Sequence, residues 1–175
     1  MENNTKIPLI PFYFVRHGET DWNKLRPTTC CPEDITLNET GLEQARKACT
    51  PISSLGITQI CSSPLLRTKQ TADIINSQLQ VPLAYHEGLR ENMPEKVAIA
   101  LEQILTPSHT TLIVSHGEVY RLLLRILHIQ DAEPKAKNCG VNFFSPPQTD
   151  SNHNSDPNSD PNYNKWSVLT IANNT

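Results

Sequence analysis

Two histidine–glycine steps lie far apart in the chain, and each directly follows a short apolar run. The first lies in Arg16-His17-Gly18-Glu19-Thr20 and follows residues 12–15, and the second lies in Ser115-His116-Gly117-Glu118 and follows residues 112–114. An unprotonated imidazole nitrogen can attack phosphorus, and a neighbouring guanidinium can hold the anion that it attacks. One such histidine could be merely structural, but the repeated pattern predicts a site for phosphoryl transfer.

A third segment, residues 62–72, carries Arg67 in the first turn of a predicted helix that follows a predicted strand. A guanidinium beside the backbone N–H groups of a helix N-terminus is well placed to bind phosphate. Gly18 would let the backbone approach the anion without a side chain in the way. The alternative for each arginine is a surface ion pair.

These residues need a scaffold, and the hydrophobic pattern predicts one in which strands and helices alternate. Strands are predicted at residues 12–15, 57–61, 81–86, 110–115, 139–144 and 166–172. Helices are predicted after Asn38 with an interruption at Pro51, and at residues 65–79, 95–105 and 117–127. The alternation indicates an α/β fold, a three-layer sandwich with a largely parallel central sheet and helices on both faces. In such folds ligands bind at the carboxyl ends of the strands.

A polar segment at about 145–165 interrupts this pattern with asparagine, serine, aspartate and proline. It cannot form a core, so we expect a long, flexible connection between the last two strands. Calcium binding by its aspartates is less favoured because the ligand spacing of known loops is missing. We expect residues 1–175 to form a single domain.

Charge and cysteine content exclude several classes of protein. The formal net charge is −3, so no global basic field exists to hold nucleic acid or an anionic membrane. Five cysteines without a C-x-x-C spacing favour reduced thiols over a disulfide framework or a zinc site. The first residues do not resemble a signal peptide, and no apolar run is long enough for a membrane span. We therefore expect a cytoplasmic protein.

Residues 12–128 resemble the histidine phosphatase superfamily, which includes the cofactor-dependent phosphoglycerate mutases. Residues 16–23 follow its signature R-H-G-E-T-x-W-N, and residues 37–45, residues 62–72 and the second histidine–glycine step match further motifs in the family's order. The resemblance implies a phosphoglycerate-mutase-like fold. It also implies that His17 becomes phosphorylated and that Arg16, Arg67 and His116 surround the transferred group.

The same resemblance implies two further roles. Asn23 would add a hydrogen bond to the phosphate, and Glu91, in a segment that matches the family's L-x-E, would protonate the leaving oxygen. The sequence after Glu91 departs from the family pattern, so Glu95 and Glu118 remain alternative proton donors. No metal or other cofactor is expected, because two guanidiniums and an imidazole can hold the charge of the transition state.

The region between Glu91 and His116 is shorter than in the mutases that the chain resembles, and it leaves little room for a lid. An open site lets water reach a phosphorylated histidine, so we expect a phosphatase acting on phosphomonoesters or phosphohistidine. The alternatives are a phosphoglycerate mutase and a non-catalytic module that binds a phosphorylated ligand. The substrate would be a phosphorylated small molecule or a phosphoprotein, and neither its identity nor the oligomeric state follows from the sequence.

Overall fold

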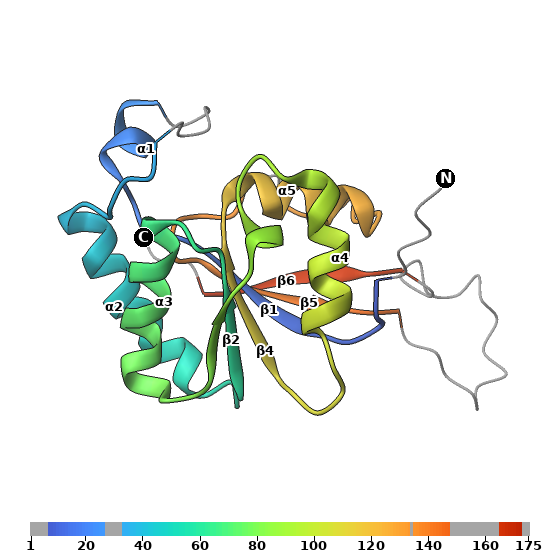
Figure 1. The fold of residues 1–175 in the computed structure, drawn as a ribbon. Coiled ribbons are helices and arrows are strands. Elements are labelled where there is room, and N and C mark those ends of the chain that lie inside the picture. Colours follow the sequence, from blue (N-terminus) through green and yellow to red (C-terminus); the bar gives the residue numbers. More distant parts are fainter. Residues whose placement is uncertain (1–6, 27–32, 134, 148–164, 173–175) are drawn as a thin grey trace, which may run out of the picture.

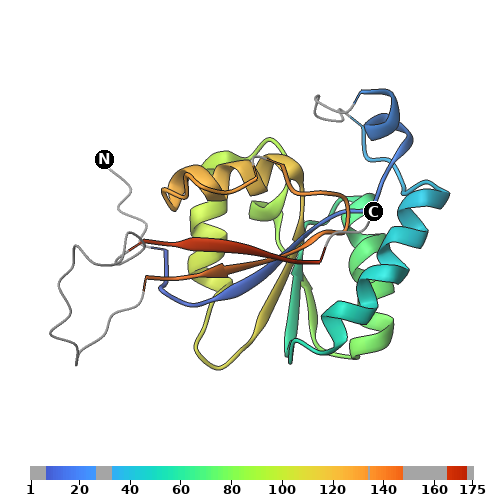
Figure 2. The same cartoon turned by 180° about the vertical axis from the view of Figure 1, so that it is seen from behind.

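The computed structural model describes residues 7–26, 33–133, 135–147 and 165–172. In that part of the chain, six strands form one sheet in the order β3-β2-β4-β1-β5-β6 (Figure 1). Their bounds are β1 (Phe12–Arg16), β2 (Gln59–Ser62), β3 (Leu83–Tyr85), β4 (Thr111–Ser115), β5 (Val141–Ser145) and β6 (Ser167–Ala172). The first four are mutually parallel, whereas β5 runs antiparallel to β1 and β6 antiparallel to β5. Figure 2 shows the antiparallel edge from its own side.

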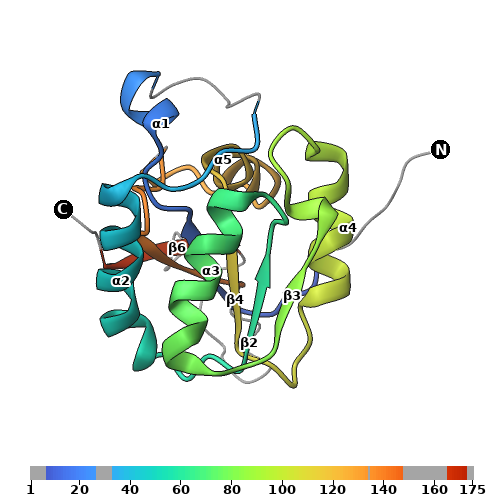
Figure 3. The same ribbon diagram turned by 60° about the vertical axis from the view of Figure 1, so that its left-hand side comes forward.

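Helices cover both faces of the sheet, so the predicted three-layer α/β sandwich is confirmed (Figure 3). One layer contains α2 (Glu39–Ser53) and α3 (Leu66–Leu79), and the other contains α4 (Pro94–Ile104) and α5 (Gly117–Ile126). The short helices α1 (Asp21–Leu25) and η1 (Glu87–Leu89), which the sequence pattern did not predict, complete the described elements.

Alternation along β1 explains why the sheet carries a core on each face. Phe12 and Phe14 join the cluster that packs against α4 and α5, and Val15 joins the cluster that packs against α2 and α3. Successive side chains of a strand point to opposite faces, so a strand buried on both sides is apolar along its whole length. This explains the continuous apolar runs that precede both histidine–glycine steps.

The predicted interruption at Pro51 is wrong, because α2 continues through Pro51 to Ser53. A proline inside a helix removes one backbone donor and disfavours the turn before it. Here the proline lies in the last turn, where few backbone hydrogen bonds remain to be disturbed. Its neighbour Ile52 is completely buried in the apolar face of the helix, and this burial favours completing the turn.

The strands that flank the predicted polar connection are present as β5 and β6. Residues 148–164 of that connection lie outside the described residues. The neighbouring cysteines Cys30 and Cys31, in a different part of the chain, lie outside them as well. The single-domain organisation of residues 1–175 stays a prediction. Among the helices in the described ranges, none has both the length and the apolar character that crossing a membrane requires.

Candidate active site

The two histidine–glycine steps meet because β1 and β4 are neighbouring parallel strands. Arg16 pairs with Ser115 at the carboxyl end of the two strands, and the His17 N–H donates to the Ser115 carbonyl at 3.0 Å. Because the strands are parallel, the chain leaves both of them at the same edge of the sheet. The His17 and His116 ring centroids consequently lie 5.3 Å apart.

His17 is held as a neutral imidazole with a defined tautomer. Its Nδ1 atom lies 2.8 Å from the Gly18 carbonyl oxygen, which can only accept, so Nδ1 carries the hydrogen and Nε2 keeps its lone pair. The side chain is 2% exposed. Burial, reinforced by the positive charge of Arg16, lowers the pKa of His17 to about 3. The ring therefore offers an unprotonated nitrogen over the physiological pH range.

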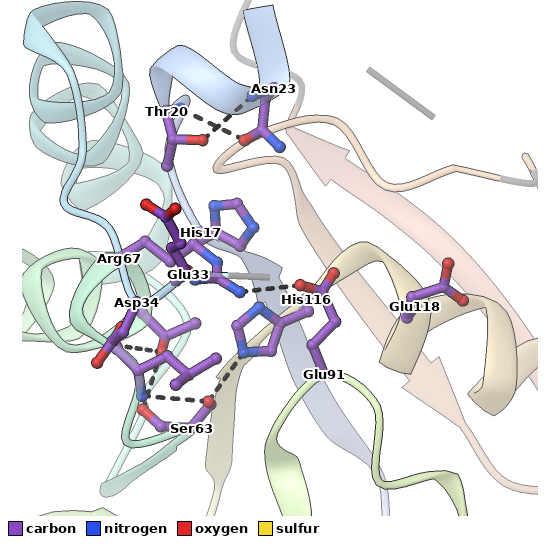
Figure 4. Close-up of polar contacts among 12 residues, drawn as sticks. His17, Thr20, Asn23, Glu33, Asp34, Ser63, Arg67, Glu91, His116 and Glu118 are labelled. Atoms are coloured by element: carbon purple, nitrogen blue, oxygen red, sulfur yellow. Dashed lines mark hydrogen bonds and ion pairs between the residues drawn. The ribbon is translucent and has the colours of Figure 1, made fainter. Parts of the chain in front are cut away.

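Arg67 projects from the first turn of α3 into the same region (Figure 4). It is 1% exposed, and its Nη2 atom donates to Glu91 Oε2 at 2.8 Å. Its Nη1 atom donates to the Glu33 carbonyl at 3.4 Å, and Asp34 Oδ1 accepts from the Leu66 N–H at 2.6 Å. Residues 33 and 34 thus hold the start of α3.

Glu91 approaches this cluster from the opposite side of the sheet. The Ser115 hydroxyl donates to the Leu89 carbonyl at 2.7 Å and so ties the end of β4 to η1, which precedes Glu91. The Glu91 side chain is 11% exposed and forms the ion pair with Arg67. The segment that follows β3 therefore places the Glu91 carboxylate beside Arg67 and the two histidines.

The two alternative carboxylates are placed differently. Glu118 lies on α5 and forms an ion pair with Arg121, and in Figure 4 it stands on the side of Glu91 that faces away from His17. Glu95 is exposed in the first turn of α4. Of the three, Glu91 is the one with an ion pair to Arg67.

His116 is completely buried and is oriented by Ser63. Its Nε2 atom lies 2.8 Å from Ser63 Oγ, which also accepts from the Leu65 N–H at 3.4 Å. Burial, followed by the electrostatic interaction with the His17 ring and the positive charges of Arg67 and Arg16, lowers the pKa of His116 well below its usual range. In Figure 4 the other ring nitrogen faces the side where Arg67 and Glu91 meet.

Two buried nitrogens in this cluster have no hydrogen-bond partner among the described residues. They are Nδ1 of His116 and Nε of Arg16, whose Nη1 atom donates to the Ala136 carbonyl at 3.2 Å. Buried polar atoms are normally satisfied, and each exception calls for an explanation such as a ligand. An oxyanion between Arg16 and His116 could satisfy both atoms.

Asn23 and Gly18 lie in the neighbourhood but with different contacts from those expected. Asn23 Oδ1 accepts from the Thr20 N–H at 3.3 Å in a capping box of α1, and Figure 4 shows this pair on the side of His17 away from Ser63. The Gly18 N–H donates to Thr71 Oγ1 at 3.1 Å. A Cβ at Gly18 would lie 2.4 Å from the Gly41 carbonyl oxygen, so close packing against α2 demands the glycine.

Two further polar residues position the site, and sequence reasoning assigned them no such role. One is Ser63, and the other is Asn138, whose Nδ2 atom donates to the His17 carbonyl at 2.8 Å. Ser63 lies in the segment that carries Arg67, yet nothing in that segment indicates a contact with His116. Within the described ranges, no group of three or more histidine, cysteine, aspartate or glutamate side chains gathers as metal ligands would.

Comparison with known proteins agrees with this geometry. The family model of the histidine phosphatase superfamily (branch 1) matches residues 12–96. An uncharacterized phosphatase, PhoE, of Bacillus subtilis (strain 168) is 43% identical over 77 residues, which cover 44% of this chain and 39% of that protein. A probable phosphoglycerate mutase, GpmB, of Escherichia coli is 40% identical over 83 residues, which cover 47% of this chain and 38% of that protein. The matched region thus spans about two fifths of these curated relatives.

A solved structure extends the likeness beyond the matched motifs. YhfR of Bacillus stearothermophilus superposes with a TM-score of 0.71 over 91% of this chain and 95% of its own, at 19% sequence identity. At that identity the match concerns the fold, and the fold is the phosphoglycerate-mutase-like one that the motifs implied. The family model over residues 12–96, the curated relatives and the fold together support membership of the histidine phosphatase superfamily.

Proposed function

We propose that this protein hydrolyses phosphomonoesters, or phosphohistidine, through a covalent intermediate on His17. The observation that carries the proposal is the buried, neutral His17 ring, whose Nδ1 hydrogen is held by the Gly18 carbonyl. Its Nε2 lone pair needs no deprotonation before it attacks phosphorus. A histidine in this state is suited to nucleophilic catalysis and poorly suited to general acid catalysis.

The groups around His17 are suited to holding a phosphoryl group. We assign Arg16, Arg67 and His116 to its oxygens, with the two unsatisfied nitrogens of Arg16 and His116 as donors. We assign the Ser63 hydroxyl as the donor to His116 Nε2, which puts the ring hydrogen of His116 on Nδ1. Asn23 could add a bond through its amide nitrogen, since only the oxygen is used in the capping box.

The reaction then proceeds in two displacements at phosphorus. In the first, Nε2 of His17 forms a bond to phosphorus while the ester P–O bond breaks, and the Glu91 carboxyl gives its proton to the leaving oxygen. In the second, the Glu91 carboxylate takes a proton from water, the water oxygen bonds to phosphorus, and the P–N bond breaks. His17 is thereby returned to its neutral state and Glu91 to its protonated state, the form that it takes once the bound phosphate has displaced its carboxylate from Arg67.

A phosphatase is favoured over a mutase by what lies between Glu91 and His116. Residues 94–104 and 111–115 form α4 and β4, and short connections make up the rest. A mutase must exclude water while its intermediate reorients, which requires a cover over the site. Without an additional helix there, water can reach the phosphorylated histidine. The cytoplasmic location stays a prediction.

The proposal is tested by rapid quench with a radiolabelled phosphomonoester. Wild-type protein should form a phosphoenzyme that is labile in acid and stable in alkali, and it should release phosphate over many turnovers. His17→Ala should do neither, whereas His109→Ala, which changes an exposed histidine, should do both. Full turnover by His17→Ala would refute the covalent mechanism. A phosphoenzyme that forms without release of phosphate would favour the non-catalytic alternative.

A further inference from the structure

A hollow lies between α5 and the segment that follows η1, the segment that carries Glu91. Its volume is about 320 Å³, which is enough for a small organic molecule. Three arginines line it, together with apolar side chains from α4, α5 and the loop before α4; the arginines are Arg90, Arg121 and Arg125, and the apolar residues include Met93, Val97 and Leu122. The proposed reaction uses none of them.

Two segments that line the hollow also carry or contact residues of the catalytic cluster. On one side, Arg90 and Asn92 line it and flank Glu91, the residue assigned to the leaving oxygen. On the other side, α5 begins at Gly117 against Arg16, where an added Cβ would lie 3.4 Å from Arg16 Nε. Glu91, assigned to the leaving oxygen, also stands between His17 and the lining residue Glu118 in Figure 4, so the hollow lies on the side of the centre that the leaving group would occupy.

Charge within the hollow is predominantly positive. Arg90 pairs with Glu87 at 3.2 Å, outside the lining, and Arg121 pairs with Glu118, the one carboxylate that contributes to the lining. Arg125 is exposed and has no ion-pair or hydrogen-bond partner for its side chain in the described part of the chain. Three guanidiniums against one carboxylate leave the hollow able to attract an anion.

The walls combine this charge with apolar surface. Met93 and Pro94 offer apolar surface on which an aliphatic or aromatic body can be buried, and the core residues Val97 and Leu122 lie behind them. Arg125 and Arg121 stand one helical turn apart on α5. A second phosphate or a sugar would leave the apolar face unused. A carboxylate on an apolar body uses both.

We propose that this hollow binds the leaving group, and that the preferred substrates are phosphomonoesters of apolar alcohols or phenols that carry a carboxylate. The assignment rests on the proposed hydrolysis at His17, because the leaving group is defined by that reaction. Arg125 supplies the uncommitted cation, Arg121 becomes available when the carboxylate competes with Glu118, and the apolar wall selects the body of the ligand.

The test compares 4-carboxyphenyl phosphate with 4-carbamoylphenyl phosphate, two esters of similar size that differ in the charge of the para group. Wild-type protein at low ionic strength should show a kcat/KM about fivefold higher for the carboxylate ester, as one charged contact near the surface provides. Arg125→Gln should bring the ratio close to one. Arg46→Gln, which removes an exposed arginine of α2, should leave the ratio as in the wild type.

A further variant is expected to increase the preference for the carboxylate ester. Glu118→Gln removes the carboxylate from the lining and releases Arg121, so it should raise the preference for the carboxylate ester above the wild-type value. A wild-type ratio near one, or a preference that survives both Arg125→Gln and Arg121→Gln, would overturn the assignment of the hollow.

Binding of the unphosphorylated products separates this inference from the hydrolysis itself. By calorimetry, 4-hydroxybenzoate should bind more tightly than 4-hydroxybenzamide to wild-type protein, and Arg125→Gln should abolish the difference. If no ester is hydrolysed and no phosphoenzyme forms, the proposed reaction fails, and this binding difference still decides for or against an anion site in the hollow. Equal binding of the two products would count against it.

Discussion

The Nδ1 atom of His17 lies 2.8 Å from the carbonyl oxygen of Gly18, the next residue in the chain. The peptides on both sides of Gly18 are anchored: the Gly18 N–H donates to Thr71 Oγ1 on α3, Asn138 Nδ2 donates to the His17 carbonyl, and the Glu19 N–H donates to Gln44 Oε1. The imidazole is therefore oriented by backbone that α3 and the loop before β5 hold from either side. This relationship leads to the proposed nucleophile and to the first prediction.

Stability should fall as the pH is lowered from about 6.5 toward 3. The pKa of His17 in the folded protein is about 3, below its ordinary value of 6.5, so between these values the unfolded chain binds a proton that the folded chain does not. The free energy of unfolding then rises with pH by up to ~1.4 kcal/mol per pH unit for each such histidine. His116 adds to the slope in the same direction.

The change that isolates His17 is His17→Asn. Urea unfolding at a series of pH values between 4.5 and 7 should give a slope smaller than that of the wild type, because His116 and His86, whose pKa values burial also lowers, keep their share. His109→Asn, at an exposed position, should leave the slope as it was. An unchanged slope in His17→Asn would show that His17 protonates alike in the folded and unfolded chain.

Glu91→Gln should lower kcat about a hundredfold for alkyl phosphates, whose leaving oxygen needs a proton. The loss should be much smaller for phosphorylation by 4-nitrophenyl phosphate, whose leaving group departs as an anion. Burst kinetics with the two substrates measure this difference. Glu95→Gln, at an exposed position on α4, serves as the matched control and should behave as wild type. A loss of equal size with both substrates would contradict the role of Glu91 as acid.

Ser63→Ala should lower kcat/KM about tenfold, because it removes the hydrogen bond that orients the His116 ring. The loss should appear in the rate of phosphoenzyme formation, and Ser63→Thr should restore part of it. Ser62→Ala is the matched control, because the neighbouring Ser62 hydroxyl is also buried but donates to the Ser63 carbonyl instead of contacting His116. If the two alanine variants were equally impaired, a general packing effect would explain the loss in place of the orientation of His116.

Gly41→Ala should destabilise the fold by about 3 kcal/mol, although alanine is the better helix former by ~1 kcal/mol. A Cβ at this position of α2 would lie 2.1 Å from the Glu19 carbonyl oxygen, which is a backbone atom that cannot move aside alone. Chemical denaturation measures the change. Thr40→Ala, one residue earlier and exposed, should show no comparable loss. A stabilised Gly41→Ala would mean that α2 and the loop after His17 can separate.

Much of the fold could be predicted because its signals are local. The run from Phe12 to Val15 and the run from Leu112 to Val114 indicate buried strands, and the period of apolar residues indicates each of the helices α2 to α5. Pro51 misled the prediction because the local cost of a proline was weighed without the burial of Ile52 against the sheet. Local preference decides an element when nothing else opposes it, and tertiary burial decides the rest.

The sequence by itself determined which residue types the site contains, since Arg16, His17, Arg67 and His116 stand at predicted strand and helix ends. Only the tertiary structure decided that Glu91 forms the ion pair with Arg67, that Ser63 orients His116, and that Arg125 lines a hollow beside them. The physical reason is range. A strand or a helix follows from contacts within a few residues, whereas a hydrogen bond or a cavity between distant segments exists only once the sheet and its two helical layers have packed.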